Sequence, residues 1–216
     1  MRALPRLTVV LLAAGLLAGC GSDPAPGDQA GTTTEQSVPP AMEQRESPAA
    51  GGALPVTAPE IDGLEVLAED PSHEHRDGAI EYDRTPPLGG PHNPRWLACD
   101  VYDEPVPAEF AVHSIEHGAV WISYDPELPA DQIAQLETLA KADREYVLLA
   151  PRAGLDSRIV AVTWGMGLEA SSADDPRLAE FVAKLAGGGQ GGEPGAPCRG
   201  SGLTLREANG LLATAS

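Results

Sequence analysis

The feature that most limits what this chain can fold into is its N-terminal segment, residues 1–20. Arg2 and Arg6 precede an apolar core that runs from Leu7 to Leu17, and small residues then lead to Cys20. Because this core is too short to span a bilayer, the segment is typical of an export signal that is removed from the mature chain. The remainder is therefore expected to fold outside the cytoplasm, where thiols oxidise.

The residues that end this segment add a membrane anchor to the prediction. Leu17-Ala18-Gly19-Cys20 resembles the lipobox of bacterial lipoproteins, in which the cysteine is lipidated and becomes the mature N-terminus. The resemblance implies a protein that is held at the cell membrane by lipid on Cys20 and faces away from the cytoplasm. The alternative is an ordinary signal peptide that is followed by an incidental cysteine.

The charge of the chain excludes some partners. The formal net charge is −18, and removal of residues 1–19, which contain two arginines and no acidic residue, makes it −20. A protein this acidic is not expected to bind nucleic acid or to dock on anionic lipid headgroups. The predicted contact with the membrane is therefore the N-terminal lipid, and the charge names no substrate or protein partner.

Composition divides the chain into four parts. Residues 1–19 are the predicted signal, and residues 20–59 the lipidated cysteine and a disordered stalk, rich in Pro, Gly, Ser, Thr and Ala and without an aromatic residue. Residues 60–200 are long enough for one globular domain with a core. Residues 201–216 are a C-terminal tail, in which residues 203–216 are expected to form a short helix.

Three cysteines are present, and Cys20 is assigned to the lipid. Cys99 and Cys198 remain as an even pair in an oxidising compartment, which favours a disulfide bond between them. A free thiol and a thiolate metal ligand are the alternatives.

The pattern of apolar residues predicts an α+β domain whose mixed sheet is covered by two helices. The helices are expected over residues 128–142 and 174–186, and a short helical turn over Pro107–Ser114. A Pro/Gly-rich irregular segment, residues 84–96, interrupts the regular structure and carries a histidine. Strands are expected at Ile61–Leu67, Ala79–Asp83, Ala119–Tyr124, Tyr146–Ala150 and Ile159–Trp164.

All five histidines lie between residues 73 and 117: His73, His75, His92, His113 and His117. Neutral imidazole is the commonest metal ligand, and several must converge on one ion, so the crowding indicates a metal site. A pair two residues apart shares one side of an extended segment, and a pair four apart shares one face of a helical turn. Each histidine alone is as well explained by packing or capping, and Glu74 and Glu116 are candidates to orient the rings.

The segment His113–His117 also matches H-x-x-E-H, the signature of a class of zinc peptidases in which the glutamate activates water. Two features argue against this interpretation. Gly118 and the strand behind it leave room for one helical turn at most, and the comparably distant acid, Glu193, lies in a glycine-rich loop.

Long segments of the domain resemble the uncharacterised bacterial family called domain of unknown function 3105. The resemblance covers about residues 70–198 and is carried by segments 86–96, 99–129, 146–165, 172–182 and 192–198. It implies a secreted or lipid-anchored protein with G-P-H and V-H-x-x-E-H-G as hallmarks, which here place His92, His113, Glu116 and His117 as functional candidates. His73 and His75 match an upstream H-x-H-type segment. The chain departs from the family at residues 163–167, where an arginine-type residue is expected after Trp-Gly.

We therefore predict an extracytoplasmic lipoprotein that binds copper or zinc through the histidines, with Cys99–Cys198 as a structural crosslink. Copper is slightly favoured because Met166 would add a soft ligand, although packing explains Met166 equally well. Imidazole also suits nickel and iron. One alternative function is a metal-dependent hydrolase or oxidoreductase with Glu116 as base. Another is a non-metal interaction module, whose histidines hydrogen-bond a loop or sense pH.

Overall fold

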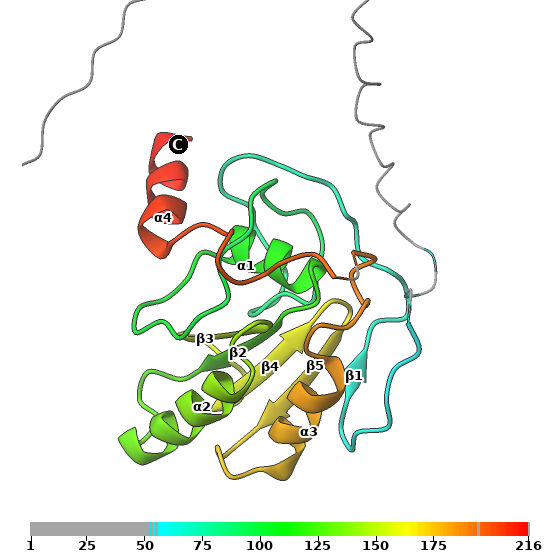
Figure 1. The fold of residues 1–216 in the computed structure, drawn as a ribbon, viewed down its shortest axis with the longest axis vertical. Helices are drawn as coiled ribbons and strands as arrows, with labels where there is room; N and C mark the ends of the chain where they lie inside the picture. The colour runs from blue at the N-terminus through cyan, green and yellow to red at the C-terminus, as the bar shows by residue number, and fades with distance from the viewer. Residues whose placement is uncertain (1–51, 53, 55, 194, 216) are drawn as a thin grey trace, which may run out of the picture. The chain divides into compact units, whose positions relative to one another are not determined.

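A mixed five-stranded sheet is the centre of the fold (Figure 1). The computed structural model describes residues 52, 54, 56–193 and 195–215, so the predicted export signal and Cys20 lie outside the described residues. Across the sheet, strands β2 and β3 are parallel and every other neighbouring pair is antiparallel. The order is β1 (Glu65–Val66), β5 (Met166–Ala170), β4 (Ile159–Thr163), β2 (Val120–Tyr124) and β3 (Val147–Pro151).

Four helices accompany the sheet: α1 (Ala108–Glu116), α2 (Ala130–Ala142), α3 (Pro176–Leu185) and α4 (Leu205–Thr214). Helix α2 connects the parallel strands β2 and β3, as a parallel pair requires. Helices α2 and α3 lie in front of the sheet in Figure 1, while α4 stands apart from them near the end of the chain. The prediction of an α+β domain with two covering helices is confirmed.

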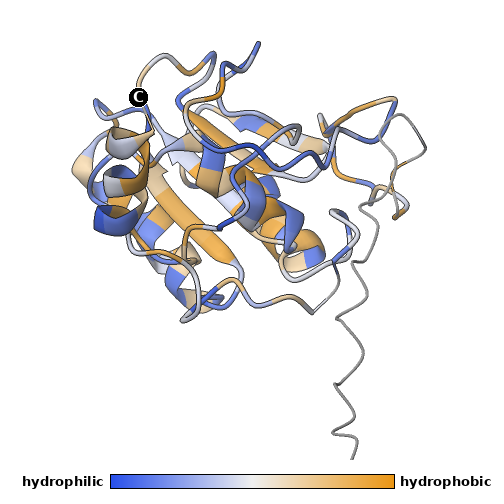
Figure 2. Ribbon diagram, turned by 90° about the horizontal axis from the view of Figure 1, so that it is seen from above, coloured by the Kyte–Doolittle hydropathy of each residue, from blue (hydrophilic) through white to orange (hydrophobic). Residues whose placement is uncertain are grey.

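The two faces of the sheet pack against different elements. In β2, Val120 and Ile122 belong to the apolar cluster that contains α2 and α3, whereas Trp121 belongs to the cluster that contains α1. This follows from the two-residue period of a strand, and the central strands, which are buried on both faces, carry much of the hydrophobic colour in Figure 2. The face that carries α1 is the one on which the histidines gather.

Several predicted strand bounds are wrong. Residues 79–83 form no strand, because Ile80 donates its backbone N–H to the Glu109 carboxylate at 3.1 Å rather than to a neighbouring strand. The expected strand Ile61–Leu67 shortens to β1. Strand β5 was not expected from the sequence, since Gly165 and Gly167 interrupt its apolar pattern. A Cβ at Gly167 would lie 2.9 Å from Leu88 Cδ2, so a larger residue would force the buried Leu88 side chain to shift.

Helix α1 is longer than the predicted turn Pro107–Ser114, and it includes His113 and Glu116. It ends where Gly118 takes a left-handed φ of 91°, a conformation that glycine adopts without strain. A Cβ at Gly118 would also lie 2.3 Å from the Gly188 carbonyl oxygen. The glycine after the histidines therefore both ends the helix and admits the glycine-rich segment beside it.

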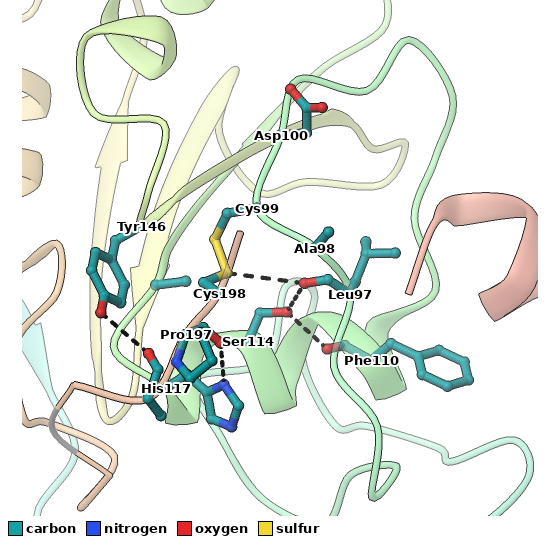
Figure 3. The surroundings of a disulfide bond; sticks show 12 residues. Leu97, Ala98, Cys99, Asp100, Phe110, Ser114, His117, Tyr146, Pro197 and Cys198 are labelled. Carbon is teal, nitrogen blue, oxygen red and sulfur yellow. Dashed lines mark hydrogen bonds between the residues drawn. A yellow bond between two sulfur atoms is a disulfide. The ribbon is translucent and has the colours of Figure 1, made fainter. Parts of the chain in front are cut away.

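The C-terminal segment is tied to the domain by the predicted disulfide, which is confirmed between Cys99 and Cys198 (Figure 3). Both cysteines are buried in the apolar cluster on the α1 face. Helix α4 confirms the expected terminal helix and begins at a capping box between Thr204 and Glu207. Among the described residues, no helix is long and apolar enough to cross a membrane.

Candidate metal centre

Three segments converge on helix α1. The segment around His75 lies along the Pro/Gly-rich segment around His92, with Arg76 N–H donating to the His92 carbonyl and His92 N–H donating to that of Glu74. Helix α1 contributes His113 and Glu116, and the glycine-rich segment that follows α3 reaches the end of this helix. There a Cβ at Gly191 would lie 2.1 Å from the Glu116 carbonyl oxygen, so only glycine permits the approach.

Three histidines are held in the same way. The Nδ1 atom of His92 lies 2.8 Å from the Gly90 carbonyl oxygen, and the Nδ1 of His113 lies 2.7 Å from that of Asn93. The Nδ1 of His117 lies 2.8 Å from the carbonyl of Pro197, next to the disulfide (Figure 3). Because a carbonyl oxygen only accepts, each Nδ1 carries a proton, and the neutral form of each ring therefore presents an unprotonated Nε2. Metal-binding histidines are commonly fixed by this arrangement.

The Nε2 atoms of these rings face other electron-pair donors. His113 Nε2 and His117 Nε2 are 3.1 Å apart, and His92 Nε2 lies 2.9 Å from Glu116 Oε2. Among the described residues, the buried His92 Nε2 finds no hydrogen-bond partner. Two lone pairs at such distances repel each other unless a proton or a metal ion lies between them.

The spacings agree with those of ligands on one metal ion. Two nitrogen ligands at about 2.0–2.1 Å from a tetrahedral zinc ion lie roughly 3.3–3.4 Å apart. The structure brings two groups together in which all ligand atoms lie within 4.8 Å of one another. We call them the inner set, which consists of His75, His92, His113 and Glu116, and the outer set, which consists of His113, His117 and Glu193.

His73 has a different role from the other histidines. Its Nδ1 lies 2.5 Å from Glu116 Oε1 and its Nε2 lies 3.1 Å from Asp70 Oδ2, so both nitrogens face carboxylates. Burial alone would lower the pKa of His73, but the hydrogen bonds to Glu116 and Asp70 outweigh burial and raise it. His73 therefore orients Glu116, as an imidazolium, instead of presenting a free nitrogen to an ion.

The electrostatics leave the site ready for a cation. Burial would raise the pKa of the Glu116 carboxyl, but its hydrogen bonds, with the largest contribution from His73, lower this pKa to about 2. Burial lowers the pKa of His113 to about 4. At neutral pH, Glu116 is therefore an anion and His113 a neutral imidazole, which are the protonation states that metal ligands need.

Two tryptophans and one carboxylate complete the surroundings. Trp164 stacks on His73 with ring centroids 4.5 Å apart, and its Nε1 donates to Asp70 Oδ1 at 2.9 Å. Trp96 packs against His117 with centroids 4.7 Å apart. These apolar walls lower the local dielectric and so strengthen the interaction of the ligands with an ion.

The predicted site residues are thus mostly brought together, with three differences, the first of which is that His73, predicted as a ligand, supports Glu116 instead. Met166 is buried on the opposite face of the sheet, in the cluster with α2 and α3, and so the structure does not bring it to the histidines. Met166 therefore gives no reason to prefer copper over zinc at the histidine cluster. Conversely, Glu193, which the sequence reasoning set aside as a loop residue, lies with its Oε2 3.3 Å from His117 Nε2.

The sequence contained one indication that Glu193 lies near the histidines. The expected disulfide brings Cys198, and with it the segment that carries Glu193, back toward residue 99 and the chain that leads into α1. Tyr146 also holds the segment that carries Glu193 in place, because its hydroxyl donates to the Ala196 carbonyl at 3.2 Å.

Comparison with known proteins gives a family and no characterised relative. Neither a curated protein nor a solved structure matches the chain. The sequence model of one family matches residues 73–200, which is more than half of the chain and contains every ligand of the inner and outer sets. The chain therefore belongs to the family described as protein of unknown function (DUF3105).

Proposed function

We propose that this protein is an extracytoplasmic lipoprotein that binds one divalent transition-metal ion, zinc or copper, through its histidine cluster. The observation that carries the proposal is the set of Nε2 atoms on His92, His113 and His117. Each ring has its Nδ1 proton committed to a backbone carbonyl, so each Nε2 is a free electron pair. A metal ion is the partner that such a group accommodates best.

The charge of the surroundings supports a single ion. Asp70, Glu116 and Glu193 contribute three negative charges, and His73 between two carboxylates contributes one positive charge. One divalent ion neutralises the remaining charge of −2, whereas a second ion would leave the cluster positive in a largely buried place. Imidazole and carboxylate ligands suit both Zn²⁺ and Cu²⁺.

The experiment is a titration of the full chain, treated first with chelator, with Zn²⁺ and separately with Cu²⁺. We expect saturation at one ion per chain for the physiological metal. Thermal unfolding should shift upward with metal concentration, because an ion that binds only the folded state stabilises it by about 4 kcal/mol at a thousand times Kd. If the thermal unfolding temperature is unchanged both in excess Zn²⁺ and in excess Cu²⁺, the proposal is refuted.

A second candidate function, a metal-dependent hydrolase, is favoured by one observation. The outer set of two histidines and Glu193 resembles a three-ligand catalytic site with an open position, and Glu116 lies beside it. Against it, Glu116 bonds to His73 and its pKa of about 2 makes it a weak base at neutral pH. Metal-dependent cleavage of peptide or ester substrates that is lost in Glu116→Gln would establish this function instead.

The membrane location rests on the lipobox-like residues that end at Cys20. Replacing Cys20 with Ala removes the acceptor of the lipid, so the exported protein should move from the membrane fraction to the soluble fraction. Fractionation with immunoblotting measures this shift, and Ser37→Ala, a small change in the predicted stalk, is the control that should stay in the membrane fraction. A Cys20→Ala protein that stays in the membrane fraction would contradict the anchor.

A further inference from the structure

The inner and outer sets overlap at one residue, His113. The Nδ1 of His113 is committed to the Asn93 carbonyl, so this ring offers a single nitrogen, Nε2, to an ion. An ion held by the whole inner set and another held by the whole outer set therefore cannot be present at once. The two sets are alternative positions for one ion.

The two positions differ in their access to solvent. The side chain of Glu116 in the inner set is 4% exposed, whereas that of Glu193 in the outer set is 50% exposed. Each set has one exposed member: His75, 43% exposed, in the inner set and Glu193, 50% exposed, in the outer set. The His75 ring stacks on His113 with centroids 5.1 Å apart, so it lies over the inner set as an uncharged cover or a cation, whereas Glu193 brings a carboxylate to the surface. A cation that arrives from solvent therefore meets an exposed carboxylate only at the outer set, because the carboxylate of the inner set is buried.

The segment that carries Glu193 is anchored to the domain by hydrogen bonds on both sides of this residue, while Glu193 itself is half exposed. Gly187 N–H donates to the Gly118 carbonyl at one side, and the Pro197 carbonyl accepts from His117 at the other. Between them, Gly192 has a left-handed φ of 80°, which lets the chain turn sharply at the surface. Glu193 is thus the most accessible carboxylate of the cluster.

From this arrangement we infer that the cluster transfers its ion between two positions, and that Glu193 and His117 are the entry and exit ligands. The inference rests on the proposed function. The ion keeps its bond to His113 while the bonds to His117 and Glu193 break and those to His92 and Glu116 form. The step is an exchange of ligands in which the ion keeps its oxidation state and each Nδ1 keeps the proton that it donates to a backbone carbonyl. Such a site suits exchange of the ion with a partner or chelator that approaches Glu193.

The test follows Co²⁺ as the probe, because its visible absorbance reports the ligands. Uptake by the chelator-treated full chain is measured by stopped flow, and removal is measured with excess EDTA. Glu193→Gln should slow uptake and removal by roughly tenfold each, within the range by which a charge at the mouth of a site changes cation on-rates. The Kd should stay within about threefold, because solvent screens the lost charge from an ion at the inner set. The matched control is Glu127→Gln, an exposed glutamate on the β2–α2 connection, which should match the wild type.

Three results would overturn the inference: a Glu193→Gln chain with unchanged rates, one with weaker affinity but unchanged uptake, or a wild type that binds two Co²⁺ ions. A wild type that binds none of Co²⁺, Zn²⁺ and Cu²⁺ would instead refute the proposed function. The two failures are therefore distinguishable.

Discussion

Replacing Cys99 and Cys198 together with Ala is expected to lower the free energy of unfolding by about 3–5 kcal/mol. The disulfide joins residues separated by 99 positions, and a loop of about this size corresponds to roughly 4.7 kcal/mol of lost chain entropy in the unfolded state. Domains of this size are stable by only about 5–15 kcal/mol, so a large share of the stability depends on this bond.

The disulfide also supports the candidate site. The Pro197 carbonyl, which fixes His117, precedes Cys198 directly, and Cys99 N–H donates to the Cys198 carbonyl at 3.2 Å. Without the bond, the segment that carries Glu193 loses its nearest covalent attachment to the domain. We therefore expect weaker metal binding together with the lost stability.

Denaturant unfolding of the double variant, compared with wild type at equal pH and without metal, measures the effect through the midpoint and the slope. Cys20→Ala is the matched control, because it removes a cysteine that takes no part in the crosslink, and its midpoint should not change. A double variant within about 1 kcal/mol of wild type would show that the loop closure contributes little here.

The second large effect is expected for His113→Ala, because His113 is the ligand that both sets share. Removing a residue that only orients a ligand typically costs 10–100-fold in metal affinity, so removal of the shared ligand should exceed about 100-fold. At a metal concentration a thousand times the wild-type Kd, stabilisation should fall from about 4 to at most roughly 1.4 kcal/mol.

The measurement is a competition titration together with metal-dependent thermal unfolding. Gln135→Ala, on the exposed side of α2, is the control for a polar side chain removed far from the histidines. The metal-free unfolding of His113→Ala separates loss of a ligand from loss of fold, because the variant leaves the Asn93 carbonyl without its partner ring. Wild-type affinity in His113→Ala would exclude both ligand sets.

The sequence predicted the elements whose burial is dictated locally. The apolar runs of β2 and β4 and the amphipathic face of α3 are visible in the chain, because strands buried on both faces and a half-buried helix leave clear patterns. Strand β5 was missed because Gly167 serves the packing of Leu88, a residue distant in the sequence. The expected strand at residues 79–83 failed because a carboxylate on α1 takes the hydrogen bond of Ile80.

The candidate site also has features that the local sequence predicted and features that depend on long-range contacts. Crowding of the histidines is a local property, and it correctly indicated that His75, His92, His113 and His117 would meet near Glu116. Two roles depend on long-range contacts and were not predictable from spacing. His73 lies between Asp70 and Glu116, which makes it a support for a ligand, and Glu193 reaches His117 only through the return of the chain at Cys198.

Elemental analysis of the untagged full chain, purified from its native source, tests the central claim most directly. The account predicts close to one equivalent of zinc or copper per chain, lost when His113 is replaced by Ala. A folded, disulfide-bonded wild type that contains less than about one-tenth of an equivalent of any transition metal, and that takes up none on addition of Zn²⁺ or Cu²⁺, would contradict it.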